Sequence, residues 1–193
     1  MRDFIEAAAS TNSNTFYGEM VGLFYLRKAL QDFVAAGQHL DNVKKTLFYG
    51  RRLYDVEKHH RWGVDLVPLV GLIDPNIIHG IIGQATESTE LIEALLAGIE
   101  RFIEGKPVAL DHVNLLEETG DTMWYQAILL RALGSDFATE GRRVIAKLML
   151  RYPDGFTEEN ALVRDLRRER ALLEATPNAE GVFTIPQPVE ADE

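Results

Sequence analysis

The chain of 193 residues contains no cysteine. Disulfide bonds, thiolate zinc sites and thiol nucleophiles are therefore excluded, together with a secreted disulfide-stapled scaffold. The sequence also lacks a long apolar run, because the longest clean one, residues 66–73, is interrupted by Pro68 and is too short to span a bilayer. The first residues, MRDFIEAAAS, carry Asp3 and Glu6 where a signal peptide needs a basic and then an apolar stretch. These absences predict a cytoplasmic protein that has no membrane partner.

Basic side chains are scarce relative to acidic ones. The sequence has 20 Lys and Arg against 30 Asp and Glu, which gives a formal net charge of −10 at pH 7. Such a surface argues against sequence-independent binding of a nucleic acid polymer, which depends on Lys and Arg to neutralise phosphates. It leaves open a nucleotide ligand, because a divalent cation can lie between carboxylates and phosphates. The remaining composition is that of a globular protein, with 46% hydrophobic and 26% charged residues.

The chain contains no convincing alternation of apolar and polar residues, and its apolar periodicity is helical. We therefore expect an all-α fold, with helices at about 17–36, 40–58, 76–104, 111–133, 136–150 and 157–175. Gly37 is the expected stop of the first helix, and residues 1–15 are expected to form a leader or loop. The expected division is an N-terminal helical extension and connector (1–75), a catalytic helical core (76–175) and a tail (176–193) that is either disordered or an extended arm.

Carboxylates recur at helical spacing on two neighbouring predicted helices. Glu87 and Glu90 are three residues apart, Glu93 follows at the same interval, and Glu118 and Asp121 repeat the pattern on the next helix. Residues at i and i+3 share a helix face, and apolar residues flank both motifs. Antiparallel pairing through the 105–110 turn would bring four or five carboxylates together, where they repel one another unless protons or cations neutralise them. Mg²⁺ is the preferred cation for oxygen ligands that also hold phosphates, whereas acids on a solvated helix face are the alternative interpretation.

Three segments, ATESTELIEAL (85–95), NLLEETGDTMWY (114–125) and IAKLMLRYPDGF (145–156), resemble the MazG-like all-α nucleoside triphosphate pyrophosphohydrolases. That family carries an ExxE motif, a spacer and then an ExxD motif, and here 27 residues separate Glu90 from Glu118. The resemblance covers about residues 76–175. It implies a helical bundle of that type completed by oligomerisation, as a homodimer or homotetramer.

The resemblance also implies an activity and a set of site residues. The expected reaction is Mg²⁺-dependent hydrolysis of a nucleoside triphosphate between the α and β phosphates, with Mn²⁺ as a substitute cation. The implied metal ligands are Glu87, Glu90, Glu118 and Asp121, with Glu93 and Glu117 as additional ligands or as partners of the ligands. Glu90 is the first candidate for the catalytic base and Glu87 the second, and the implied substrate-binding residues are Lys147, Arg151 and Tyr152.

The chain departs from the family pattern at two positions. Many relatives have an acidic pair where this chain has Thr86-Glu87, so one accessory carboxylate is replaced by a hydroxyl. An Asn often found three residues before the Lys is here Val144.

Other groups have two interpretations each. The basic residues Lys44, Lys45, Arg51 and Arg52 either help to bind a triphosphate or pair with the excess acid. Trp62, Trp124 and Tyr125 either stack on a base or pack in the protein. Glu57 and His60 form one ExxH motif, whereas a di-iron carboxylate bundle needs two. The alternatives to the hydrolase are therefore a non-catalytic helical nucleotide-binding or interaction protein and, more distantly, a di-iron protein.

Overall fold

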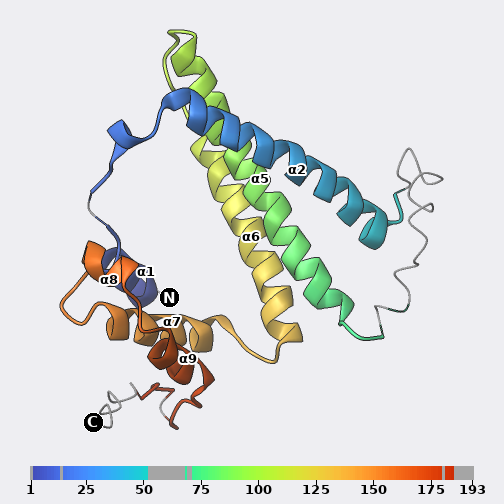
Figure 1. The fold of residues 1–193 in the computed structure, drawn as a ribbon. Helices are drawn as coiled ribbons and strands as arrows, with labels where there is room; N and C mark the ends of the chain where they lie inside the picture. The colour runs from blue at the N-terminus through green and yellow to red at the C-terminus, as the bar shows by residue number, and fades with distance from the viewer. Residues whose placement is uncertain (1, 14, 52–67, 69–70, 180, 185–193) are drawn as a thin grey trace. The chain divides into compact units, whose positions relative to one another are not determined.

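The computed structural model describes residues 2–13, 15–51, 68, 71–179 and 181–184 (Figure 1). These residues form α-helices and one short 3₁₀ helix, and no strand occurs among them, so the all-α prediction is confirmed. None of the helices in the described part of the chain has the length and apolar character that crossing a membrane requires. The chain divides into two compact units, Gly18–Gly134 and the combination of Met1–Tyr17 with Ser135–Glu193. The predicted core, 76–175, contributes residues to both units.

The first unit consists of α2 (Leu23–Tyr49), α5 (Pro75–Ile103) and α6 (His112–Ala132), preceded by the 3₁₀ helix η1 (Gly18–Met20). Helices α5 and α6 run antiparallel side by side, and α2 packs across α5 (Figure 1). The starts of α5 and α6 follow sequence signals for helix initiation. Asp74 accepts a hydrogen bond from the backbone N–H of Asn76, with Pro75 in the first turn. Asp111 accepts from two backbone N–H groups at the start of α6.

The prediction of separate helices at 17–36 and 40–58 is wrong, because α2 is continuous through Gly37. That glycine is buried where α2 meets α5, and a Cβ atom there would lie 1.9 Å from the Thr89 Oγ1 atom. The missing side chain therefore serves close helix packing and does not end the helix. The helix ends instead at Gly50, whose φ of 66° is the left-handed conformation typical of a helix terminus.

Small residues also bring α5 and α6 together. The α5 residues buried in the unit are Gly80, Gly83, Thr86, Glu87, Thr89 and Gly98. A Cβ atom on Gly83 would lie 2.0 Å from Cδ1 of Tyr125, so the tyrosine ring of α6 lies directly on the α5 backbone. Close approach of the two backbones brings side chains that leave one helix within reach of those on the other.

The second unit contains α1 (Arg2–Ser10), α7 (Phe137–Arg151), α8 (Glu158–Leu162) and α9 (Leu166–Glu174). The expectation that residues 1–15 form only a leader or loop is wrong, since α1 is helical and packs against α7. The prediction of one continuous helix over residues 157–175 is also wrong. It is interrupted at residues 163–165, where the Asp165 side chain accepts from the backbone N–H of Arg168 and starts α9.

The described part of the tail is an arm that packs on its own unit. Phe183 is buried, and the Arg143 guanidinium lies 5.0 Å from its ring centroid. The Arg142 Nε–H donates a hydrogen bond of 2.9 Å to the carbonyl of Gly181. The sequence left residues 176–193 either disordered or an extended arm laid on a neighbour, and the described part lies on its own unit. Residues 185–193 lie outside the described residues.

Candidate metal centre

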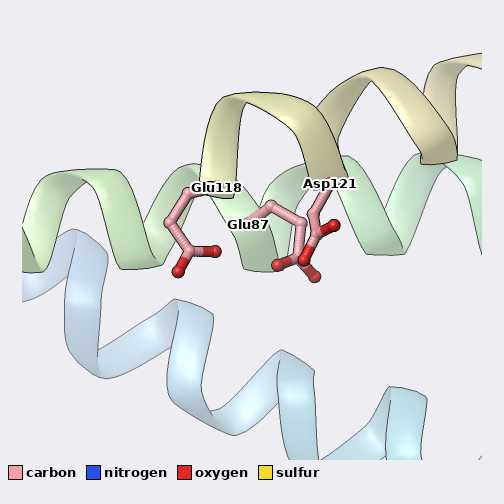
Figure 2. Close-up of side chains that lie close together, drawn as sticks. All are labelled: Glu87, Glu118 and Asp121. Atoms are coloured by element: carbon pink, nitrogen blue, oxygen red, sulfur yellow. The ribbon is translucent and has the colours of Figure 1, made fainter. Parts of the chain in front are cut away.

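Three of the predicted ligands converge between α5 and α6. Glu87 comes from α5, whereas Glu118 and Asp121 come from α6 and are one helical turn apart. One carboxylate oxygen from each lies within 4.8 Å of the other two, and the side chains point toward the side on which α2 passes (Figure 2). Glu87 and Glu118 are buried, while Asp121 is exposed. An all-oxygen donor set with one open side fits a hard divalent cation such as Mg²⁺, with further positions left for water or phosphate oxygens.

Glu118 is held in place by a residue of its own helix, and its ionised form is disfavoured by burial and by neighbouring acids. The Asn114 side-chain amide donates a hydrogen bond of 2.8 Å to Glu118 Oε1. Burial of the carboxyl group, followed by the charges of Glu90 and Glu87, raises the pKa of Glu118 from 4.5 to about 7. In the absence of a cation, the folded protein therefore favours the protonated carboxyl at this position.

Glu90, the fourth predicted ligand, lies beside this triad but is not one of its three members. Its side chain is exposed and shares a hydrogen bond with Glu118. Partial burial and then the charge of Glu87 raise the pKa of Glu90, although the bond with Glu118 opposes that shift. The structure thus brings Glu90 next to the candidate centre, where a carboxylate of raised pKa is suited to accept a proton.

The two predicted accessory acids have other environments. The Glu93 carboxylate accepts a hydrogen bond of 2.6 Å from the Gln38 side chain of α2. Glu117 is exposed and acts on the centre only through its charge, which raises the pKa of Glu118 as a lesser contribution after Glu90 and Glu87. Neither residue belongs to the converging triad.

A lysine from α2 reaches into the same centre. Lys44 Nζ lies 3.0 Å from Glu87 Oε1 and 2.6 Å from Thr86 Oγ1, and only 4% of the residue is exposed. Burial opposes its charge, yet the hydrogen bond and the charge of Glu87 hold the pKa of Lys44 above its ordinary value. Lys45 likewise forms an ion pair with Asp41. Both lysines therefore pair with acidic side chains, which is the second of the two interpretations given for the basic residues. Arg52 lies outside the described residues.

Aromatic side chains cover the end of the centre nearest the start of α5. His79 stacks on Phe48 with ring centroids 3.9 Å apart, and it meets the edge of Tyr125 at 5.3 Å. Tyr125 is buried, and its hydroxyl lies 3.3 Å from that of Tyr49. Trp124 is 55% exposed beside this group. Tyr125 therefore belongs to the helix packing, whereas Trp124 keeps a surface on which a ring could stack.

The predicted substrate-binding residues lie at the end of α7 in the second unit. Arg151 forms a bidentate ion pair with Glu169, at 2.8 and 2.7 Å, and Arg164 contacts the same carboxylate. Tyr152 is buried beside Phe156, and Lys147 is half-buried. The binding of phosphate by these three residues stays a prediction. The Glu57–His60 motif and Trp62 lie outside the described residues.

Sequence reasoning missed Gln38 and Asn114, which donate hydrogen bonds to Glu93 and Glu118. It also missed the specific role of Lys44, which pairs with Glu87 and with Asp41. A signal for Lys44 exists in the sequence. It lies four residues after Leu40, three before Leu47 and four before Phe48, which places a lysine on the apolar face of the helix. A lysine in that position needs a buried acidic partner.

No family model, curated protein or solved structure matches the chain. The resemblance to MazG-like enzymes therefore depends on the motifs alone.

Proposed function

We propose that this chain is a Mg²⁺-dependent nucleoside triphosphate pyrophosphohydrolase, which releases pyrophosphate and a nucleoside monophosphate. The observation that supports it is the convergence of Glu87, Glu118 and Asp121 from two antiparallel helices onto one site. Glu87 and Glu118 are both buried, which is uncommon on a solvated helix face; Lys44 pairs with Glu87, whereas the burial of Glu118 among other acids is costly unless a proton or a cation neutralises it. The spacing of the motifs is that of the MazG-like family.

In this proposal Glu87, Glu118 and Asp121 hold the cation. When bound, Mg²⁺ supplies charge neutralisation for the phosphates and lowers the pKa of a coordinated water. Glu90 is the better candidate for the base, because Glu87 Oε1 already accepts a hydrogen bond from the Lys44 ammonium. The exposed Glu90 carboxylate takes the proton of the attacking water. The family resemblance implies that Lys147 and Arg151 bind phosphate, and this role stays a prediction from the motif.

A direct assay tests this function. The purified chain is incubated with a panel of ribo- and deoxyribonucleoside triphosphates and Mg²⁺ or Mn²⁺, and pyrophosphate release is measured. Glu118→Gln removes a buried ligand and is expected to lower turnover at least 100-fold with helix content unchanged. Glu104→Gln is the matched control, because Glu104 follows α5 at the surface and pairs with Lys106. If no triphosphate releases pyrophosphate, or if Glu118→Gln is fully active, the proposal is wrong.

We also propose that the active form is a homo-oligomer, a dimer or tetramer. Large apolar side chains are exposed on α2 and α6, among them Tyr25 at 77%, Val113 at 76% and Leu116 at 74%. A second copy of the chain could cover them, because contiguous exposed apolar surface often marks a protein interface. Light scattering coupled to gel filtration tests this, and the monomer mass would refute it.

The chemistry of the candidate metal ligands helps to distinguish the proposed hydrolase from the two alternatives, a di-iron protein and a non-catalytic binding protein. Among the described residues, the side chains that converge on the site are all carboxylates, which favours Mg²⁺ or Mn²⁺ over an iron site built from ExxH motifs. A non-catalytic nucleotide-binding or interaction protein would bind triphosphate and cation without releasing pyrophosphate, so the same assay combined with a binding measurement distinguishes it.

A further inference from the structure

We propose that Lys44 is a positioning residue that takes the place of a second divalent cation, so that the centre binds one such ion per chain. The inference rests on the proposed function, because it concerns how the same carboxylates are neutralised. Lys44 lies in α2, outside residues 76–175, so it has no counterpart in the motifs that carry the family resemblance.

The ammonium group has the surroundings of a bound cation. Its neighbours are three oxygens from two helices, with Thr86 Oγ1 at 2.6 Å, Glu87 Oε1 at 3.0 Å and Asp41 Oδ1 at 3.3 Å. The ring of Tyr125 offers its face from a further side, with the centroid 5.1 Å from Nζ. Two carboxylates and a hydroxyl are ligands that a divalent ion would also accept if the ammonium were absent.

The ammonium also fixes which oxygen of Glu87 remains for a metal. Within the described residues, the hydrogen bond from Lys44 to Glu87 ends on Oε1, and Thr86 Oγ1 lies 3.1 Å from the same oxygen. Oε2 is therefore the oxygen that can turn toward Glu118 and Asp121. Lys44 thus orients Glu87 as a ligand with one oxygen, and it needs no contact with substrate to do so.

The position of the ammonium limits the number of ions. Lys44 Nζ lies 3.0 Å from Glu87 Oε1 and 3.3 Å from Asp41 Oδ1, so it occupies the space between these two carboxylates. A second divalent cation bound by the same two carboxylates would lie next to the ammonium. Like charges at such separations repel strongly in a buried site. While Lys44 is in place, we therefore expect a single divalent ion, held by Glu87, Glu118 and Asp121.

Lys45 provides the matched control. It is the next residue of α2 and also forms an ion pair with Asp41, but its side chain is 38% exposed and makes no contact with Glu87. Replacing it removes the same charge from the same helix without opening the space beside Glu87.

The test counts bound Mn²⁺. Chelator-treated full-length chain is titrated with Mn²⁺ without nucleotide, free Mn²⁺ is measured by electron paramagnetic resonance, and circular dichroism reports helix content. We expect one ion per chain in the wild type and in Lys45→Ala, and two in Lys44→Ala, where the vacated oxygens take the second ion.

The number of Mn²⁺ ions bound by the wild type tests the inference even if Lys44→Ala does not fold. Two ions in the wild type overturn the inference about Lys44 and leave the pyrophosphohydrolase proposal intact. No bound ion in the wild type overturns both, since the metal centre itself then fails. A folded Lys44→Ala chain that still binds one ion also overturns the inference.

Discussion

Replacing Glu118 by Gln is expected to stabilise the chelated protein at alkaline pH, although it removes a metal ligand. Folding raises the pKa of Glu118 from 4.5 to about 7, so the folded state binds this proton more tightly than the unfolded state. The tighter binding of this proton contributes to the free energy of unfolding. That contribution is fully present below pH 4.5 and is lost as the pH rises through 7. At 1.36 kcal/mol per pKa unit, the loss is about 3 kcal/mol for this buried group.

The glutamine side chain isolates that effect. It cannot ionise, and its carbonyl oxygen can still accept the hydrogen bond from Asn114. With a chelator present, we expect wild type and Glu118→Gln to be equally stable at pH 4. At pH 8 the variant should be more stable by about 3 kcal/mol. Urea unfolding followed by circular dichroism measures both values, and Glu104→Gln should follow the wild type throughout.

Adding Mg²⁺ at pH 8 should then reverse the order. A ligand that binds only the folded state at 1,000 times its dissociation constant stabilises that state by about 4.1 kcal/mol, which exceeds the advantage of the variant. The wild type should gain this amount, whereas Glu118→Gln should gain little because a ligand is missing. If the chelated wild type is as stable as the variant at pH 8, the assignment of a strained, unneutralised carboxylate cluster is wrong.

Three further substitutions test the packing around and beyond the centre. Glu169→Gln should destabilise the protein near pH 7 by about 3 kcal/mol but not at pH 2. The hydrogen bonds from Arg151 and Arg164 lower the pKa of Glu169 to about 2 in the folded state. This contribution to the free energy of unfolding is therefore lost as the pH falls from 4.5 to 2, and unfolding measured over an acid titration tests it. Gly37→Ala should cost about 2 kcal/mol in denaturant unfolding because its Cβ would overlap Thr89, whereas Gly120→Ala, with open space around it, should be neutral or slightly stabilising. Asp111→Ala should lower stability by about 1 kcal/mol through loss of the α6 cap, and an unchanged melting temperature would contradict that role.

The sequence predicted the α5–α6 pair well because its signals are local. Asp74 with Pro75 marks the start of α5, Asp111 precedes α6, and the glutamates keep helical spacing between them. Two antiparallel helices joined by a short turn have little freedom in which faces meet, so the convergence of Glu87 with Glu118 follows from periodicity.

The errors arose where glycine has two possible roles. Gly37 was expected to stop a helix, but tertiary packing against Thr89 requires a residue without a side chain in a helix interior. Gly50, which lay within a predicted helix, is the actual terminus. Helix propensity treats both glycines alike, and only the position of α5 distinguishes them.

The threonine at residue 86 and the lysine buried beside it have one physical explanation. Thr86 is 2% exposed, and its hydroxyl accepts from Lys44 while donating to the carbonyl of Gly83. A glutamate in this fully buried position would need more space and would add a second carboxylate directly beside Glu87. The threonine instead provides the oxygen that completes the surroundings of the ammonium. A neutral residue at position 86 of α5 and a basic one at position 44 of α2 both make the local charge less negative, so the two positions should be substituted and tested as a pair.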